Sequence, residues 1–433
     1  MRVIITPGKL RGCIKAIASK SAAHRLLICA ALADQPTDII CEELSEDIEA
    51  TARSLNQLGA DIIYDSAAGL FHAVPVRKCT EKCALDVGES GSTLRFLLPV
   101  VCALGIKAHI LMRGRLPKRP LSPLWEELER HGCCLKRNPD GSVDTSGKLY
   151  GGEFRMAAGV SSQFISGLLF ALPLLKETSR IRLSGSVESE GYIRMTIRAL
   201  EQFGVRTVRD GDVLTVSAVP GKQNDSGDLS DTQDNVRKAV YTSPGTVVTD
   251  GDWSNGAFWK IAGMLTDGGA GSLVCTGLDK SSVQGDRAVR QLKNIVAAGN
   301  TVVDVRNIPD LVPVLSVLAA VSPGTTIFAH AERLRLKESD RIRSTVNMLR
   351  ALGGNAEETA DSLIVHGQKR LKGGCVDSCQ DHRIAMSAAI ASIACENEVV
   401  ITGAEAVRKS YPAFWEDFKK LGGKVIIEPQ RDS

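Results

Sequence analysis

One local pattern recurs six times along the chain: an amphipathic segment, a glycine, and a run of strand-forming residues. Each glycine suits the left-handed backbone position that closes a helix. Six similar units indicate internal duplication. The longest spacing is the third, and it divides the units into three and three. The six glycines are Gly59, Gly132, Gly204, Gly299, Gly353 and Gly422.

The same alternation predicts the fold class. Strand-forming runs that alternate with helical segments and end in short hairpins are typical of α/β units. We therefore expect an α/β protein of two lobes with three repeats each. The long gap contains the polar, turn-rich stretch 220–235, which we interpret as an insertion. The predicted lobes are residues 1–18 with 238–433, and residues 19–237.

Charge and composition exclude several classes of protein. The 433 residues include 53 basic and 50 acidic side chains, and only 4% are aromatic. A nucleic-acid-binding protein would carry a basic stripe with aromatic residues interleaved, so we expect no nucleic-acid partner. The longest apolar run, Phe164 to Leu175, is too short to span a membrane.

The cysteines indicate the compartment. The twelve cysteines include no C-x-x-C pair, and several lie among apolar residues. A reduced thiol in such surroundings acts as a small apolar side chain. Together with an N-terminus that has no signal or transit character, this predicts a protein of the reducing cytoplasm.

Four predicted helix starts carry a capping side chain, and three of them also carry a cation. Helix N-termini of this kind bind anions, because free backbone N–H groups and the helix dipole favour negative charge. We expect Ser19 or Ser21 to cap the first helix, and Ser92 or Thr93 to cap the second. The four stretches are Ser19-Lys20-Ser21 with Arg25, Gly91-Ser92-Thr93 with Arg95, Ser161-Ser162-Gln163, and Asp381-His382-Arg383.

The stretch 333–342 is the most densely charged and contains candidate acid–base groups. A helix that starts here would place Lys337 and Arg341 on one face, with Glu338 three residues before Arg341. Carboxylates in a positive cleft stay ionised and can act as general bases. The carboxylates placed among the cations are Glu338, Asp340, Asp310 and Asp47.

Other kinds of site lack their sequence patterns. The seven histidines are scattered and show no ligand spacing, so we expect no metal. Neither GxxxxGK[ST] nor GxGxxG is present, which argues against a bound nucleotide. G-x-S-x-G is also absent, which argues against a serine hydrolase.

Taken together and in order, these motifs resemble the 5-enolpyruvylshikimate-3-phosphate synthase family. The match runs from about residue 6 to residue 422. No single motif identifies the family, but the whole set of motifs in this order is highly specific for it. The matching stretches are Ser19-Lys20-Ser21 with Arg25, Gly91 with Thr93 and Arg95, Ser161-Ser162-Gln163, Gly251-Asp252-Trp253-Ser254-Asn255, Val283-Gln284-Gly285-Asp286, Asn307-Ile308-Pro309-Asp310, Arg335 to Arg341, and Asp381-His382-Arg383.

The resemblance implies an activity and a fold. The activity is transfer of the enolpyruvyl group of phosphoenolpyruvate to the 5-hydroxyl of shikimate 3-phosphate, with release of phosphate, in the shikimate pathway to chorismate and the aromatic amino acids. The fold is a two-lobed inside-out α/β barrel, each lobe of three βαβαββ repeats, with helix N-termini facing the cleft between the lobes. The resemblance implies no cofactor or metal, and we expect a monomer.

The resemblance also implies roles for individual residues. Asp310 would take the 5-hydroxyl proton, and Glu338 and Lys20 would transfer protons at the methylene carbon. Shikimate 3-phosphate would be held by Lys20, Ser21, Arg25, Ser161, Ser162, Ser189, Tyr192, Asp310, Arg333 and Lys337. Phosphoenolpyruvate would be held by Lys20, Gly91, Arg115, Gln163, Arg341, Arg383 and Lys409.

Two positions depart from the family pattern. Glu89 stands where the family normally has Asn, and Arg113-Gly114-Arg115 stands where a Gly-Asp or Gly-Glu usually leads into the arginine loop. An acidic group here would weaken anion binding unless a cation offset it, so we expect Glu89 to pair with Arg113. Arg113, Arg115 and Arg119 are all candidate phosphoenolpyruvate ligands, and the distance to Arg119-Pro120 favours Arg115.

Two alternatives stay open at this point. The sister enzyme that transfers enolpyruvyl to UDP-N-acetylglucosamine shares the fold, but its family carries a cysteine in the arginine loop, and 113–123 has none. A non-catalytic anion-binding paralogue is the other alternative. A binding module would not need Glu338.

Overall fold

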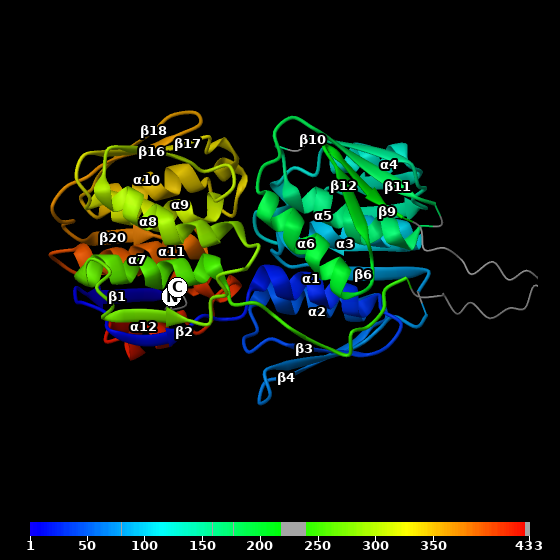
Figure 1. The fold of residues 1–433 in the computed structure, drawn as a ribbon, viewed down its shortest axis with the longest axis horizontal. Coiled ribbons are helices and arrows are strands. Elements are labelled where there is room, and N and C mark those ends of the chain that lie inside the picture. Colours follow the sequence, from blue (N-terminus) through cyan, green and yellow to red (C-terminus); the bar gives the residue numbers. More distant parts are fainter. Residues whose placement is uncertain (79, 158, 176, 218–239, 429–433) are drawn as a thin grey trace, which may run out of the picture. The chain divides into compact units, whose positions relative to one another are not determined.

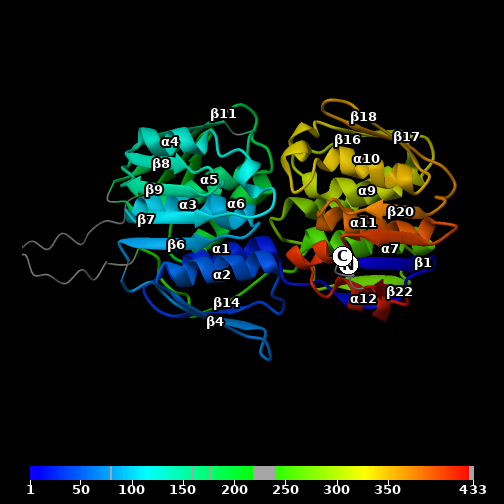
Figure 2. The same cartoon turned by 180° about the vertical axis from the view of Figure 1, so that it is seen from behind.

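The computed structural model describes residues 1–428 except 79, 158, 176 and 218–239. The chain forms two compact units: unit 1 is residues 1–19, 43–46 and 250–433, and unit 2 is residues 20–42 and 47–249 (Figures 1 and 2). The predicted insertion at 220–235 and the predicted boundary at 237/238 lie outside the described residues.

Unit 2 contains three four-stranded sheets. Their strand orders are β14-β3-β5-β4, β6-β7-β9-β8 and β10-β11-β13-β12. The helices are α1 (Lys20–Ala31), α2 (Glu46–Gln57), α3 (Gly91–Leu104), α4 (Leu124–Arg130), α5 (Ser162–Ala171) and α6 (Glu190–Gln202). The strands are β3 (Thr37–Ile40), β4 (Asp61–Asp65), β5 (Leu70–Val74), β6 (Lys82–Asp86), β7 (Lys107–Leu111), β8 (Cys133–Arg137), β9 (Val143–Gly147), β10 (Glu153–Ala157), β11 (Ser179–Ser184), β12 (Thr207–Asp210), β13 (Val213–Val216) and β14 (Thr246–Val248).

Unit 1 contains two four-stranded sheets, β16-β17-β19-β18 and β20-β21-β1-β22, and the strand pair β15-β2. The helices are α7 (Trp253–Asp267), α8 (Val289–Ala298), α9 (Val312–Ala320), α10 (Arg341–Ala351), α11 (His382–Ala391) and α12 (Phe414–Lys420). The strands are β1 (Arg2–Thr6), β2 (Gly12–Lys15), β15 (Leu273–Thr276), β16 (Thr301–Asp304), β17 (Thr325–Ala329), β18 (Asn355–Glu358), β19 (Leu363–His366), β20 (Gly374–Asp377), β21 (Val399–Thr402) and β22 (Lys424–Glu428).

The four-stranded sheets share one topology. In the sheet of β10 to β13, β10 runs parallel to β11, and α5 makes the crossover between them. An antiparallel partner, β13, then joins β11, and β12 closes the edge beside β13. Each complete repeat is therefore βαβαββ, as expected for the α/β fold class.

All six glycines of the repeat pattern lie between a helix and a strand and have positive φ angles, from 74° at Gly299 to 102° at Gly59. Only glycine adopts this conformation without strain, so the predicted helix ends are confirmed. One repeat differs. Gly299 leads into β16, the first strand of the next sheet, which pairs parallel with β17. That repeat therefore has no closing hairpin of its own, which explains the short spacing to Gly353.

The helices form the interior of each unit and the sheets form its outside. Every residue of α9 and α11 is buried. By contrast, β11 alternates strictly between buried and exposed residues, so one face of its sheet packs on helices and the other meets solvent. Figures 1 and 2 show this inside-out layering within each unit. The helix starts are then the places where polar side chains gather.

Candidate functional site

The densest polar cluster of unit 1 lies at the start of α10. Residues 332–336 form a 3-10 turn, Lys337 is extended, and Asp340 caps α10 by accepting a hydrogen bond from the backbone N of Arg343. The prediction that Lys337 and Arg341 share a helix face is therefore wrong. Asp340 adopts the extended conformation of a capping residue, which breaks the helix between the two cations.

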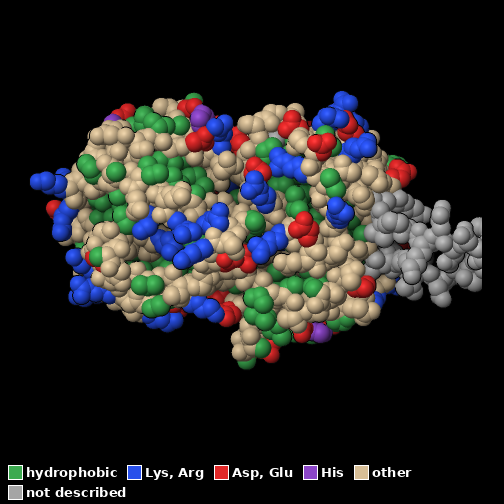
Figure 3. Space-filling model, viewed as in Figure 1, with side chains coloured by type: hydrophobic (Ala, Val, Ile, Leu, Met, Phe, Trp, Pro, Cys, Tyr) green, Lys and Arg blue, Asp and Glu red, His purple; other side chains and the backbone are tan. Residues whose placement is uncertain are grey.

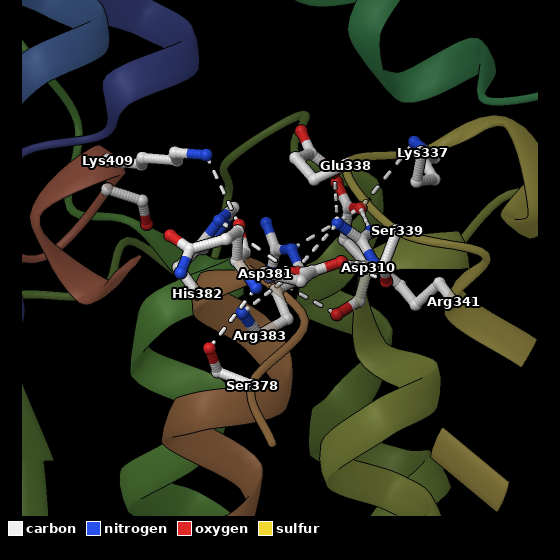
Figure 4. A network of polar contacts seen from close by, with 12 residues as sticks. Asp310, Lys337, Glu338, Ser339, Arg341, Ser378, Asp381, His382, Arg383 and Lys409 are labelled. Atoms are coloured by element: carbon white, nitrogen blue, oxygen red, sulfur yellow. Dashed lines mark hydrogen bonds and ion pairs between the residues drawn. The ribbon is translucent and has the colours of Figure 1, made fainter. Parts of the chain in front are cut away.

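Arg341 is the centre of this cluster. Its side chain is 1% exposed and ion-paired with three carboxylates: Nε lies 2.9 Å from Asp381 Oδ2, Nη1 lies 2.7 Å from Asp310 Oδ1, and Nη2 contacts Glu338 (Figure 4). Burial alone would lower the pKa of Arg341, but the three carboxylates raise it. Arg341 therefore stays charged and holds the three acids in fixed positions.

Asp310 is surrounded by cations from three elements. Besides Arg341 on α10, Arg383 on α11 places Nε 3.4 Å from Oδ1, and Lys337 places Nζ 3.6 Å from the same oxygen. Arg383 also donates from Nη1 to the Asp310 carbonyl at 3.2 Å. Opposite charges at these distances favour the ionised carboxylate, which is the form that a general base needs.

The start of α11 supplies the rest of the cluster. Asp381 caps this helix by accepting from the backbone N of Arg383, and it also accepts from Ser339 Oγ at 3.0 Å. Lys409 ends the 3-10 turn that precedes α12 and donates to the Gln380 carbonyl at 3.2 Å. Unit 1 thus brings together Asp310, Lys337, Glu338, Arg341, Arg383 and Lys409 (Figure 4). Arg333 lies partly buried in the 3-10 turn before Lys337.

In unit 2, the start of α1 carries two of the predicted cations. Lys20 Nζ forms an ion pair with Asp47 Oδ2 at 2.7 Å. Arg25 is buried and donates from Nε to Thr196 Oγ1 at 2.8 Å and from Nη2 to the Tyr192 carbonyl at 3.0 Å. Burial lowers the pKa of Arg25 to about 10, so the guanidinium is still charged at neutral pH.

A hydrogen-bonded bridge joins the starts of α3 and α5. Gln163 accepts from Arg95 Nη1 at 2.7 Å and donates from Nε2 to Ser92 Oγ at 2.9 Å. Ser161 caps α5 by accepting from the backbone N of Gln163, with Ser162 as the first helical residue. Ser90 caps α3, so the prediction of Ser92 or Thr93 as its cap is wrong. The cap lies two or three residues earlier than expected, and the helix begins at Gly91.

The arginine loop distinguishes among the three candidate arginines. A Cβ atom built on Gly91 would lie 2.8 Å from Arg119 Nη1, so this guanidinium sits directly against the start of α3. Arg115 is exposed. Arg113 pairs with Asp86 at 2.7 Å, so the predicted Glu89–Arg113 pair is wrong. Glu89 instead lies against Gly114, where a side chain would collide with its carboxylate.

The start of α6 contains the last two predicted residues. Ser189 is buried and has a positive φ of 54°, an uncommon backbone conformation for a residue with a side chain. Tyr192 follows in the first turn, and its ring lies 6.0 Å from the Arg25 guanidinium carbon. Ser189 and Tyr192 thus lie on the first turn of the helix that contacts Arg25.

Two residues near the site carry no clear local signal in the sequence. No local pattern shows which arginine the 3-10 turn 116–118 directs toward Gly91. Asp286 belongs to one of the matching motifs, but the motif does not show that it is a buried acid that interacts electrostatically with Asp310. The signal that could have found it is an acid within a glycine-containing turn that precedes a helix.

Two kinds of feature were not found in the part of the chain that the structure describes. No group of three or more His, Cys, Asp or Glu side chains there could hold a metal ion. No helix there combines the length and apolar character needed to cross a membrane.

The fold defines an α/β protein built from repeats, with cations gathered at helix starts in both units. Residues 4–418 match the model of the EPSP synthase (3-phosphoshikimate 1-carboxyvinyltransferase) family, and the chain belongs to this family. Proteins named 3-phosphoshikimate 1-carboxyvinyltransferase from Clostridium perfringens and Clostridium kluyveri are each 39% identical, over 98% of this chain and 98% of their own. An EPSP synthase structure from Acinetobacter baumannii, 22% identical, has a similar fold, with a TM-score of 0.76 over 98% of this chain and 100% of that one.

Proposed function

We infer that this protein transfers the enolpyruvyl group of phosphoenolpyruvate to the 5-hydroxyl of shikimate 3-phosphate and releases phosphate. The observation that carries the inference is the cluster around Arg341, in which Asp310 and Glu338 are held beside Arg383 and Lys337. A protein that only bound the anionic substrates would need the cations but not the carboxylates of Asp310 and Glu338. A family match over residues 4–418 supports the same activity.

We propose that the reaction runs by addition and elimination through a tetrahedral intermediate. Asp310 takes the proton of the attacking 5-hydroxyl, since three cations keep its carboxylate ionised. Glu338 and Lys20 serve proton transfer at the methylene carbon, which must first gain a proton and then lose one. The mechanism therefore requires an ionised carboxylate that accepts the hydroxyl proton, and a second group that can both give a proton to the methylene carbon and take one from it.

The proposed shikimate 3-phosphate ligands fall into two sets. Unit 2 offers hydroxyl groups at helix starts together with a buried guanidinium, a combination suited to a phosphate and its neighbouring hydroxyls. Unit 1 offers the cations next to Asp310. The unit 2 set is Lys20, Ser21, Arg25, Ser161, Ser162, Ser189 and Tyr192, and the unit 1 set is Asp310, Arg333 and Lys337.

The proposed phosphoenolpyruvate ligands differ from the sequence expectation at one position. Arg119 takes the place of Arg115, because its guanidinium lies against Gly91 while Arg115 is exposed. Gly91 matters because any side chain there would occupy the space of Arg119 Nη1. The full proposed set is Lys20, Gly91, Arg119 and Gln163 in unit 2, with Arg341, Arg383 and Lys409 in unit 1.

The experiment that tests the function is phosphate release from phosphoenolpyruvate with either shikimate 3-phosphate or UDP-N-acetylglucosamine as acceptor. We expect release only with shikimate 3-phosphate, and loss of release in Glu338→Ala. Glu332→Ala, which removes an exposed acid from the neighbouring turn, is the matched control. Release with the sugar nucleotide would favour the sister enzyme. Tight binding of shikimate 3-phosphate without release would favour the non-catalytic paralogue.

We further propose that the protein acts as a cytoplasmic monomer without a nucleic-acid partner. The eleven cysteines that the structure describes are free thiols, which suits a reducing compartment. The near balance of basic and acidic residues gives no electrostatic reason to bind nucleic acid. Light scattering coupled to size-exclusion chromatography would test the monomer, since a mass of twice 46.3 kDa would contradict it.

A further inference from the structure

The residue Asp286 is fully enclosed next to the Arg341 cluster, yet none of the roles above uses it. It lies in the 3-10 turn Gly285–Ala288 between β15 and α8, and its side chain is 2% exposed. Oδ2 accepts a hydrogen bond from Ser254 Oγ, whereas Oδ1 is buried with no hydrogen-bond partner among the described residues. An ionised carboxylate is costly in such a place unless it is paired.

The turn that carries Asp286 is fixed on both sides. Gln284 accepts from the backbone N of Trp253 at 2.9 Å and donates to the Gly251 carbonyl at 2.8 Å, which ties the turn to the start of α7. A Cβ atom on Gly285 would lie 2.8 Å from the Asn307 carbonyl, so only glycine lets the turn approach the loop that leads to Asp310. Asp286 is therefore held close to the proposed base by the backbone itself.

The charged groups around Asp286 act in opposite directions. The pKa of Asp286 is raised to about 7: burial is the largest cause and the negative charges of Asp310 and Asp252 add to it, while Arg383 and the Ser254 hydrogen bond act in the opposite direction. Asp252 is the cap of α7, where it accepts from the backbone N of Asn255 at 2.8 Å. The strongest partners of Asp286 are thus one proposed base and one proposed phosphoenolpyruvate ligand.

The other cations on the packed elements either contact other groups or are exposed. On the same turn, Arg287 donates to the Lys280 carbonyl at 2.6 Å. On α8, Arg290 is exposed and Lys293 Nζ contacts Met264 Sδ at 3.5 Å. On α7, Lys260 lies over the Trp253 ring at 5.5 Å. Figure 3 shows Lys and Arg side chains gathered on the surface over the region of α7 and α8.

We propose that Asp286 is a positioning residue that tunes anion binding at Arg383. When the Asp286 carboxyl is protonated and neutral, Arg383 binds an anion more tightly; when it is ionised, its negative charge weakens that binding. The identity of that anion as phosphoenolpyruvate rests on the proposed function. Because the effect is a coupling between two binding events, an anion bound at Arg383 must strengthen proton binding at Asp286 by the same factor.

The first test is the pH dependence of KM for phosphoenolpyruvate at saturating shikimate 3-phosphate. We expect KM in the wild type to rise about fivefold or more between pH 6 and pH 8.5, relative to Asp286→Asn, whose side chain is neutral throughout. The ratio of the two proteins removes the titration of the substrate's own phosphate. Equal pH profiles would overturn the proposal.

A second variant distinguishes charge from packing. Ser254→Ala removes a hydrogen bond that lowers the pKa of Asp286, so its rise in KM should occur at higher pH than in the wild type. A purely structural role predicts no shift of the midpoint, and either no shift or a shift to lower pH would overturn the proposal. This variant decides the matter if Asp286→Asn does not fold.

A third measurement is independent of turnover. The rise in melting temperature that inorganic phosphate causes in the wild type, relative to its rise in Asp286→Asn, should be larger at pH 6 than at pH 8; comparing the two proteins removes the titration of phosphate itself. If the enzyme transfers enolpyruvyl but the two proteins respond to phosphate alike, the proposal fails and the function stands. If phosphate responds as expected but no transfer occurs, the function fails and the role of Asp286 stands.

Discussion

The Nη1 atom of Arg341 lies 2.7 Å from Oδ1 of Asp310, and the Nε atom of the same side chain lies 2.9 Å from Asp381. One buried guanidinium therefore connects the proposed base to the capping residue of α11. The position of Asp310 depends on Arg341, and the charge of Arg341 is balanced by the acids that it positions. Disturbing either residue affects both the chemistry and the stability of unit 1.

Replacing Arg341 should destabilise the protein strongly. Arg341→Ala leaves Asp381, which is 0% exposed, without its main cation, and loss of one partner of a buried ion pair costs about 3–5 kcal/mol. Arg341→Lys should recover part of this, because lysine keeps the charge but cannot bond three carboxylates at once. Urea unfolding measures both effects.

Arg343→Ala is the matched control for Arg341, since it pairs with Glu358 on the surface with a side chain 65% exposed. It should cost less than about 1 kcal/mol. A similar loss of stability in both variants would show that the network around Arg341 has no special importance.

Replacing Asp310 should affect the chemical step. Asp310→Asn keeps the size of the side chain but cannot take a proton, so kcat should fall about 100-fold or more. Asp304→Asn, at an exposed acid paired with Arg306, should leave kcat unchanged. Steady-state kinetics with both substrates would measure the difference. An unchanged kcat in Asp310→Asn would assign the base to another group.

The two arginines of the loop 113–120 should behave differently. Arg119→Ala removes the guanidinium against Gly91 and should raise KM for phosphoenolpyruvate about tenfold or more, as expected for loss of a charged hydrogen bond. Arg115→Ala alters only an exposed side chain and should leave KM within about twofold. The reverse result would return the assignment to Arg115.

The pH dependence of shikimate 3-phosphate binding should report on Lys337. Burial lowers the pKa of Lys337 to about 8, although Asp310 acts in the opposite direction. The cation is therefore lost as pH rises through 8, and KM for shikimate 3-phosphate should increase above that pH. The substrate phosphate is already fully ionised there, because its second pKa is about 6.

Lys337→Arg separates the effect of charge from the effect of size. Arginine keeps its proton, so KM should stay level between pH 8 and pH 9.5.

The free energy of unfolding should also depend on pH. Lys337 loses its proton near pH 8 in the folded wild type but only at about pH 10.4 in the unfolded chain, so the wild type should gain stability with rising pH relative to the variant. Parallel KM curves for the two proteins would contradict the assignment.

The sequence predicted the architecture because each repeat ends with a strong local signal. A glycine with positive φ after an amphipathic segment can be recognised without tertiary contacts, and all six glycines have that conformation. The sequence could not reveal that Gly299 leads into a new sheet, because strand pairing depends on residues far away in the chain, as in the pairing of β2 with β15.

The sequence predicted which kinds of residues form the candidate site better than it predicted how they are arranged. Ser161 and Asp381 cap their helices, and the cap is a local property. The relation between Lys337 and Arg341 was misjudged because Asp340 begins the helix later than the charge pattern indicated. The sequence could not show which arginine of the loop lies against Gly91, because the path of a loop is decided by packing, which leaves no periodic signal in the sequence.

The pairing of the first strand has a consequence for how the molecule is made. β1 lies inside its sheet, between β21 and β22, and Arg2 pairs with Glu428. That sheet cannot close until a ribosome has released residue 428, whereas all the described strands of unit 2 are synthesised by residue 248. Contacts so distant in sequence form slowly. During synthesis, unit 2 can therefore reach its native structure before the β1 sheet of unit 1 is able to close.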